Sequence, residues 1–151
     1  MRDFDTDARF MRRAIELATL AGEAGEIPVG AVIVKNGDII SEGYNRRETD
    51  GLSTAHAEIV AIEAACRKLG GWRLSGCTLY VTLEPCPMCA GAIINSRIDR
   101  VVYGAADARA GCFGSVINFN SYPFNHACKI DSGVCAGECA AILRSFFEKR
   151  R

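Results

Sequence analysis

The dipeptide Asn36-Gly37 is the feature that most restricts what this chain can fold into. It lies between two apolar runs, residues 29–34 and 39–41. Asn-Gly supplies the positive φ angles that a two-residue hairpin turn requires. The two runs are therefore predicted to pair as antiparallel strands, and the rest of the fold must be built around that pair.

Helices and strands alternate around this hairpin. Helical spacing of apolar residues and short apolar runs predict helices over 5–21, 55–69, 87–95 and 135–149, and strands over 79–83, 101–104 and 127–130. Asp5 or Thr6 is available to cap the first helix. Residues 105–125 are predicted to form a long surface loop with at most a short helix. Strands joined through helices predict an α/β fold, a three-layer α/β/α sandwich around a mixed five-stranded sheet.

Length and charge indicate one compact domain that carries no strong overall field. The 151 residues are predicted to form a single domain over 1–151, since a domain typically has about 100–200 residues. Eighteen Lys and Arg residues balance eighteen Asp and Glu residues, so the net charge attracts neither nucleic acid nor an anionic membrane. Any polyanion must be met by a local basic patch.

The cellular compartment decides how the eight cysteines are interpreted. The N-terminus alternates charges and lacks the apolar core of a signal peptide, and no stretch approaches about 18 uncharged apolar residues. A cytoplasmic protein with no membrane association is therefore expected. In that reducing compartment, cysteines are predicted to be metal ligands or small buried hydrophobic residues rather than disulfides.

Two segments, His56-Ala57-Glu58 and Pro85-Cys86-Pro87-Met88-Cys89, carry a predicted metal site. Cys86 and Cys89 are three residues apart at the start of a predicted helix, so both thiols lie on one face of its first turn, where the helix dipole favours thiolate. His56, at the start of another helix, adds a neutral imidazole. One histidine and two thiolates suit zinc and leave the fourth tetrahedral position open, which indicates catalysis.

Glu58 is predicted to lie beside the metal rather than on it. It follows His56 by two residues, about 200° around an ideal helix. A carboxylate beside zinc-bound water can accept and pass on its proton, which is general acid/base catalysis. The order His-x-Glu followed by Pro-Cys-x-x-Cys is the signature of zinc deaminases.

Two structural alternatives exist for the cysteines. A structural zinc site needs four protein ligands, and one of six further cysteines would have to complete it: Cys66, Cys77, Cys112, Cys128, Cys135 or Cys139. The catalytic interpretation is preferred because none of these is paired in sequence with His56. A second metal site at Cys128, Cys135 and Cys139 is conceivable, although buried cysteines commonly act as small hydrophobic residues.

Beyond the metal motif, the chain resembles the bacterial tRNA-specific adenosine deaminases of the cytidine deaminase-like superfamily. The matching segments cover nearly the whole chain and are residues 27–32, 43–46, 54–58, 82–92, 104–107 and 125–126. The resemblance implies one zinc ion per subunit, a homodimer, and activated water attacking C6 of a flipped adenine while Glu58 moves protons. The implied product is inosine at the wobble position of an arginine tRNA, with the anticodon stem-loop as partner.

The resemblance also implies roles for substrate-binding residues. Asn45 matches the asparagine that hydrogen-bonds the target nucleoside, and the Ala57 backbone N–H faces the base. The remaining implied contacts to the anticodon loop are Asp107, Asn125, His126, Phe146 and Phe147.

Each of these residues also has an ordinary structural interpretation. Asn45 can stabilise a turn, Asp107 can cap a short helix, His126 can be a surface imidazole, and at least one of Phe146 and Phe147 is expected in the core. The basic residues that could form a phosphate-binding patch, or merely a solvated surface, are Arg46, Arg47, Arg97, Arg100, Arg109, Arg144, Lys149, Arg150 and Arg151.

The sequence departs from the family pattern in the predicted long loop. Cys112-Phe113 stands where small residues are usual, and residues 119–124 are more aromatic than usual. These residues could add base-stacking surfaces or reshape the pocket. Two other classes of function remain: a free nucleobase or nucleotide deaminase of guanine or cytosine type with the same zinc chemistry, and a catalytically idle zinc-containing RNA-binding module.

Overall fold

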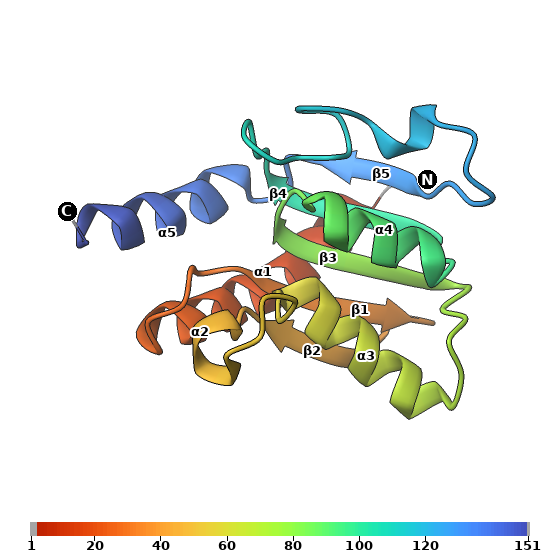
Figure 1. Ribbon diagram of the computed structural model, residues 1–151, viewed down its shortest axis with the longest axis horizontal. Coiled ribbons are helices and arrows are strands. Elements are labelled where there is room, and N and C mark those ends of the chain that lie inside the picture. The colour runs from red at the N-terminus through yellow and green to blue at the C-terminus, as the bar shows by residue number, and fades with distance from the viewer. Residues whose placement is uncertain (1–2, 151) are drawn as a thin grey trace.

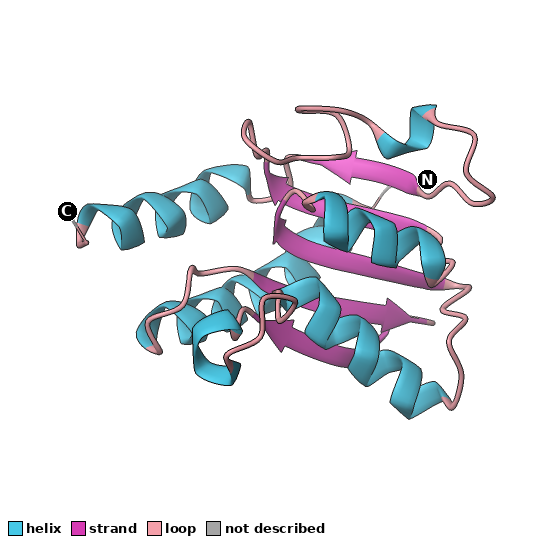
Figure 2. Ribbon diagram, in the orientation of Figure 1, coloured by secondary structure: helices cyan, strands magenta, loops and turns pink. Residues whose placement is uncertain are grey.

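Residues 3–150 are described by the computed structural model, which is a three-layer α/β/α sandwich (Figures 1 and 2). The sheet contains β1 (Gly30–Lys35), β2 (Asp38–Tyr44), β3 (Cys77–Leu83), β4 (Arg100–Ala105) and β5 (Lys129–Ser132). The helices are α1 (Phe4–Glu23), α2 (Arg47–Asp50), α3 (Ala57–Leu69), α4 (Pro87–Asn95) and α5 (Ala136–Glu148), with a 3₁₀ turn η1 (Phe119–Ser121). The predicted fold class is confirmed.

The sheet is mixed, with strand order β2-β1-β3-β4-β5. β1 pairs antiparallel with both β2 and β3, whereas β3, β4 and β5 are parallel. The predicted hairpin is confirmed: Asn36 and Gly37 have φ angles of 51° and 82° and join Lys35 to its partner Asp38. Because β3 and β4 are parallel, their carboxyl ends lie at one edge, where α4 begins.

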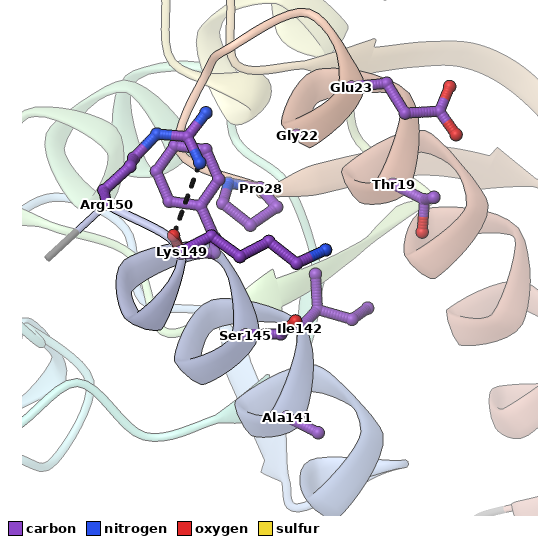
Figure 3. Close-up of a pocket in the computed structure, with 10 residues that line it drawn as sticks. Thr19, Gly22, Glu23, Pro28, Ala141, Ile142, Ser145, Lys149 and Arg150 are labelled. Carbon is purple, nitrogen blue, oxygen red and sulfur yellow. Dashed lines mark hydrogen bonds between the residues drawn. The ribbon is translucent and has the colours of Figure 1, made fainter.

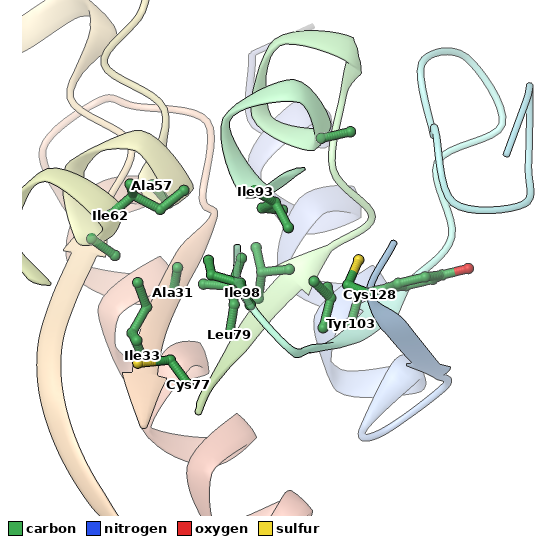
Figure 4. Close-up of a cluster of buried hydrophobic side chains, with 14 of the residues drawn as sticks. Ala31, Ile33, Ala57, Ile62, Cys77, Leu79, Ile93, Ile98, Tyr103 and Cys128 are labelled. Carbon is green, nitrogen blue, oxygen red and sulfur yellow. The ribbon is translucent and has the colours of Figure 1, made fainter. Parts of the chain in front are cut away.

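Each face of the sheet is covered by its own pair of helices. Helices α1 and α5 pack on one face, and α3 and α4 pack on the other (Figure 1). Alternate residues of a strand therefore enter different cores: Val32 packs with α1, whereas Ala31 and Ile33 pack under α3. Figure 4 shows the core under α3 and α4, in which Leu79 lies beneath Ile93.

Two helical features differ from the sequence prediction. The cap of α1 is Asp3 rather than Asp5 or Thr6, and its carboxylate accepts hydrogen bonds from the backbone N–H groups of both. The segment after β2, predicted as a loop, contains the short helix α2. A carboxylate from the segment between α1 and β1 supports this helix. Buried Glu26 accepts hydrogen bonds from the N–H groups of Glu48 and Thr49.

Glycine allows the helices to approach the hairpin closely at the end of the sheet where the candidate site lies. A Cβ atom on Gly43 would lie 2.5 Å from the carbonyl oxygen of Ala57 and 2.8 Å from the amide nitrogen of Ala61. Any side chain at Gly43 would therefore push the first turn of α3 away from β2.

A buried ionic network ties α1 to the other end of the sheet. Arg100 donates two hydrogen bonds to the carboxylate of Asp7, at 3.0 and 2.7 Å, and one to Asp131 at 2.8 Å. The Tyr80 hydroxyl donates to Asp7 at 2.8 Å. Burial and the neighbouring Asp7 carboxylate raise the pKa of Tyr80, so the hydroxyl stays a donor.

The eight cysteines are all free thiols, as the sequence analysis predicted. Across residues 3–150, every helix is too short or too polar to span a bilayer.

Candidate active site

Three potential metal ligands converge at the carboxyl end of β3. The Nδ1 atom of His56 lies 3.6 Å from Sγ of Cys86 and 3.6 Å from Sγ of Cys89. Ordinary Zn–N and Zn–S bonds in a tetrahedral site separate the nitrogen and sulfur atoms by about 3.6 Å. The donor set and its spacing therefore fit one zinc ion, with a fourth position left for another ligand. Within residues 3–150 this is the sole cluster of three potential ligands of this kind.

The starts of two helices bring these ligands together. His56 is the N-cap of α3, with φ −74° and ψ 156°, and Cys86 is the N-cap of α4, with φ −76° and ψ 175°. Pro87 follows as the first helical residue, as predicted, and Cys89 lies in the first turn. Because His56 precedes its helix in extended backbone, the 200° rotation used to separate it from Glu58 does not apply. Glu58 is nevertheless outside the three-ligand group.

The two thiols have opposite pKa shifts. The pKa of Cys86 falls to about 4, first because the Cys89 thiol donates to it and also because of His56. The same contact with Cys86 raises the pKa of Cys89, and burial adds to the effect. The pKa of His56 is raised, mainly by its hydrogen bond with Cys86. The site therefore favours a thiolate at Cys86, which is the form that binds metal.

Glu58 lies beside the ligands in the first turn of α3. It is buried, and burial is the main cause that raises its pKa to about 7. A carboxyl group with this pKa both holds and releases protons near neutral pH, as a general acid/base must.

A pocket of about 330 Å³ opens over this group, a volume typical of small-molecule sites. The residues lining it are Ile27, Val29, Asn45, Arg47, His56, Ala57, Glu58, Leu83, Glu84, Cys86, Asp107 and Ala110. The structure thus brings three of the expected substrate-binding residues, Asn45, Ala57 and Asp107, to the metal ligands.

Asn45 and Asp107 also have the structural roles considered as alternatives. The Asn45 amide donates to the carbonyl of Ile27 at 3.2 Å and accepts from the Arg47 N–H at 3.1 Å. Asp107 Oδ1 accepts from the N–H groups of Arg109 and Ala110. These bonds fix both side chains on the walls of the pocket.

Asn125 and His126 lie away from the pocket. Nε2 of His126 is hydrogen-bonded to the carbonyl oxygen of Ile98, two residues before β4 begins. The pocket lies beyond the other end of the parallel strands, and a six-residue strand spans roughly 17 Å. The fold therefore does not bring these two residues to the metal ligands.

The two phenylalanines near the C-terminus face different cavities. Phe146 is 9% exposed and contributes to a groove of about 510 Å³ between α1 and α5, and the Arg150 guanidinium lies over its ring. Figure 3 shows this groove, with Ile142 and Ser145 on the α5 side and Thr19 on the α1 side. Phe147 is 48% exposed and lines a second cavity that reaches Ala106, the residue before Asp107. The expectation that at least one ring is buried is confirmed.

The predicted basic patch is not a single surface. Arg100 was wrongly included, because its guanidinium is committed to Asp7 and Asp131. Arg46 pairs with Asp50, and Arg97 donates to backbone carbonyls at the end of α4. Only Arg47 lines the pocket itself. Arg144 lines the cavity that Phe147 borders, and Lys149 and Arg150 line the groove between α1 and α5. Arg151 lies outside the described residues.

The residues that depart from the family pattern separate into core and surface. Cys112 and Phe113 are buried in the core under α4. Tyr122 and Phe124 are half exposed and pack with Phe119, with ring centroids 5.8–6.5 Å apart. None of these five residues lines the metal pocket.

Sequence reasoning missed Glu84 as a functional residue. It lines the pocket, is 2% exposed, and accepts hydrogen bonds from the loop that carries Asp107. The available signal was its position directly before Pro85-Cys86, where a charged residue would otherwise be unexpected at the end of a buried strand.

Comparison with known proteins agrees with this geometry. Residues 4–105 match the family described as the cytidine and deoxycytidylate deaminase zinc-binding region. A tRNA-specific adenosine deaminase of Bacillus subtilis (strain 168) is 51% identical over 146 residues, covering 96% of this chain and 91% of that protein.

Two solved structures of related deaminases superpose on this chain. A structure from work on A-to-I editing by tRNA:A34 deaminases superposes with a TM-score of 0.88 at 47% identity, over 89% of this chain and 99% of that chain. A guanine deaminase from Nitrosomonas europaea superposes with a TM-score of 0.78 at 27% identity, over 92% of this chain and 83% of that chain. The chain therefore belongs to the tRNA-specific adenosine deaminase family, within the cytidine and deoxycytidylate deaminases.

Proposed function

We propose that the protein is a zinc-dependent hydrolase, a tRNA adenosine(34) deaminase that converts adenosine to inosine at the wobble position, with an arginine tRNA as substrate. The observation that carries this proposal is the group of His56, Cys86 and Cys89 with Glu58 beside it in one pocket. Two relatives that are 51% and 50% identical to this chain are named tRNA-specific adenosine deaminases, which supports adenosine in tRNA as the substrate. The chain acts as one catalytic domain over 1–151 in the cytoplasm.

The metal ligands and Glu58 divide the chemistry between them. His56, Cys86 and Cys89 hold one zinc ion per subunit, and the chemistry that zinc supplies in such a site is the activation of water as a nucleophile. Hydrolysis replaces the C6 amino group of adenine by oxygen and releases ammonia. Glu58 accepts protons from the attacking water and passes them to ring N1 and to the departing nitrogen, because its carboxyl group lies in the pocket wall next to the ligands.

The other pocket residues orient the base. The Asn45 amide has a second N–H hydrogen besides the one given to Ile27, and this hydrogen is available to the nucleoside. The backbone N–H of Ala57, in the first turn of α3, faces the base, and Asp107 borders the anticodon loop.

A homodimer explains why Asn125 and His126 lie far from the pocket in one protomer. In such a dimer, together with Phe146 and Phe147, these residues would contact an anticodon stem-loop whose wobble base occupies the partner's pocket. Mixing two inactive variants, His126→Ala and Glu58→Gln, tests this arrangement. Activity should return on mixing, because the mixed dimer has one site with intact Glu58 and an intact His126 from the other chain. No recovery in mixtures shown to exchange subunits would refute it.

The substrate is tested with the zinc-loaded protein and an anticodon stem-loop carrying adenosine at the wobble position, alongside guanine, cytosine and cytidine. Inosine and ammonia should form with the RNA alone. Turnover of a free base alone would keep the metal chemistry and overturn the substrate. RNA binding without turnover, equal in wild type and Glu58→Gln, would instead favour the idle RNA-binding module.

A further inference from the structure

We propose that Glu84 is a positioning residue, which holds the pocket wall facing the RNA in its binding geometry through the carboxylate. The inference deepens the proposed function. The wall in question is the site loop, defined as residues 106–117, which carries Asp107 and Ala110 into the pocket.

Both oxygens of this carboxylate accept hydrogen bonds from the site loop. Oε1 accepts from the Asp107 N–H at 3.0 Å and from the Ser115 hydroxyl. Oε2 accepts from the N–H groups of Phe113 and Ser115, at 3.0 and 3.1 Å. One side chain therefore joins the two limbs of the loop, which are eight residues apart in sequence.

The loop backbone is shaped around the carboxylate. A Cβ atom on Gly111 would lie 2.5 Å from both oxygens of Glu84, so any side chain at this position would displace the carboxylate from its hydrogen bonds. The Cys112 N–H donates to the carbonyl of Pro85 at 3.0 Å, which adds a backbone link beside the side-chain links. The loop makes these contacts with Glu84 and Pro85, which directly precede the ligand Cys86. They therefore hold the loop in a fixed position relative to the metal ligands.

A carboxylate is required for this role. It has acceptor sites on both oxygens and no donor, which suits three backbone N–H groups and a hydroxyl. A glutamine at this position has one acceptor oxygen and an NH₂ group. Whichever way its amide is oriented, either Asp107 or the pair Phe113 and Ser115 faces a donor instead of an acceptor.

The first test separates RNA binding from chemistry. In Glu84→Gln the loop should be in its binding geometry only part of the time, and apparent affinity falls in proportion to that fraction. We expect KM for the anticodon stem-loop to rise about tenfold, kcat to change less than threefold, and zinc content to stay at one per chain. An unchanged KM, or a loss of zinc, would overturn the proposal.

The second test does not depend on activity. Amide hydrogen exchange in residues 106–117 of the zinc-loaded protein should accelerate in Glu84→Gln. The reason is that backbone N–H groups of the loop that donate to Glu84 in wild type lose their acceptor. Asp7→Asn is the matched control, because Asp7 is another buried carboxylate with hydrogen bonds, far from the pocket. It should lower the unfolding midpoint without changing exchange in the loop or KM. Equal acceleration in both variants would reduce Glu84 to a general stability role.

The two tests distinguish this inference from the function on which it rests. If wild-type protein fails to deaminate the RNA, the proposed function fails, and loop exchange alone still decides the role of Glu84.

Discussion

Replacement of Arg100 by methionine should destabilise the protein more than any single change of its partners. Arg100 is 20% exposed at its side chain, and Asp7 is 2% exposed. Methionine fills most of the same volume but removes the two hydrogen bonds that the Arg100 guanidinium donates to the buried Asp7 carboxylate. The hydrogen bond from the Tyr80 hydroxyl to Asp7 is kept.

The magnitude follows from the cost of removing the cation from a buried ion pair. Removing one member of a buried ion pair costs about 3–5 kcal/mol, whereas the paired state is close to neutral against apolar packing. For a chain of this size, 1 kcal/mol moves the unfolding midpoint by about 2–4 °C, so Arg100→Met should unfold about 6–20 °C below wild type. Asp7→Asn should cost less, about 1.5–3 kcal/mol, because Arg100 keeps Asp131.

The double variant decides whether the reasoning is right. In the double variant the buried Asp7 carboxylate is replaced by a neutral amide, so Arg100→Met/Asp7→Asn should be more stable than Arg100→Met alone, by about 1–2 kcal/mol. The assay is thermal and urea unfolding of all four proteins at pH 7 and one fixed zinc concentration, because bound metal contributes to stability. Costs that simply add, or a loss below about 1 kcal/mol in Arg100→Met, would refute the argument.

Three further predictions concern the metal site and the carboxylate that supports α2. Glu58→Gln should abolish turnover of the stem-loop, by at least about 100-fold, yet retain one zinc per chain, because general acid/base catalysis is worth about 10²–10⁴; full activity in this variant would contradict the proton role. Cys89→Ser should lose zinc, as measured by atomic absorption, and a chelator should then leave its unfolding midpoint unchanged while lowering that of wild type. In Glu26, burial raises the pKa, but hydrogen bonds from Thr49 and from the N–H of Glu48 outweigh it, so the net pKa lies below its ordinary value of 4.5. A lowered folded-state pKa gives stability that is present above 4.5 and lost as the pH falls through the folded value. The free-energy gap between wild type and Glu26→Gln should therefore narrow on acidification below pH 4.5, and a constant gap would show that Glu26 contributes nothing through its charge.

The local features of the molecule are those that the sequence made predictable. Asn36-Gly37 determines its own turn, and Cys86-Pro87 with Cys89 forms one helical start, so hairpin and thiol pair follow from neighbours in sequence. His56 could be added because its residue type and the order of the motif identify a zinc deaminase.

Features that depend on distant partners could not be predicted in this way. Arg100 pairs with Asp7, 93 residues away. A residue that the sequence suggests for phosphate binding is therefore used in an internal ion pair. The short helix α2 is stabilised by Glu26 from outside the segment, and its own sequence gives little signal. The place of His126 depends on where β5 joins the sheet, which no local pattern encodes.

The absence of a side chain at Gly43 fixes how deeply the histidine half of the metal site is set into the protein. The first turn of α3 rests directly on this residue, with the Ala57 carbonyl oxygen occupying space that a Cβ atom would need. His56 and Glu58 flank that contact, while Cys86 and Cys89 belong to a separate helix that Gly43 does not touch. Thickening the strand by one methyl group would move one half of the site relative to the other. The distance between the imidazole and the thiols thus depends on a residue that contacts neither metal nor substrate.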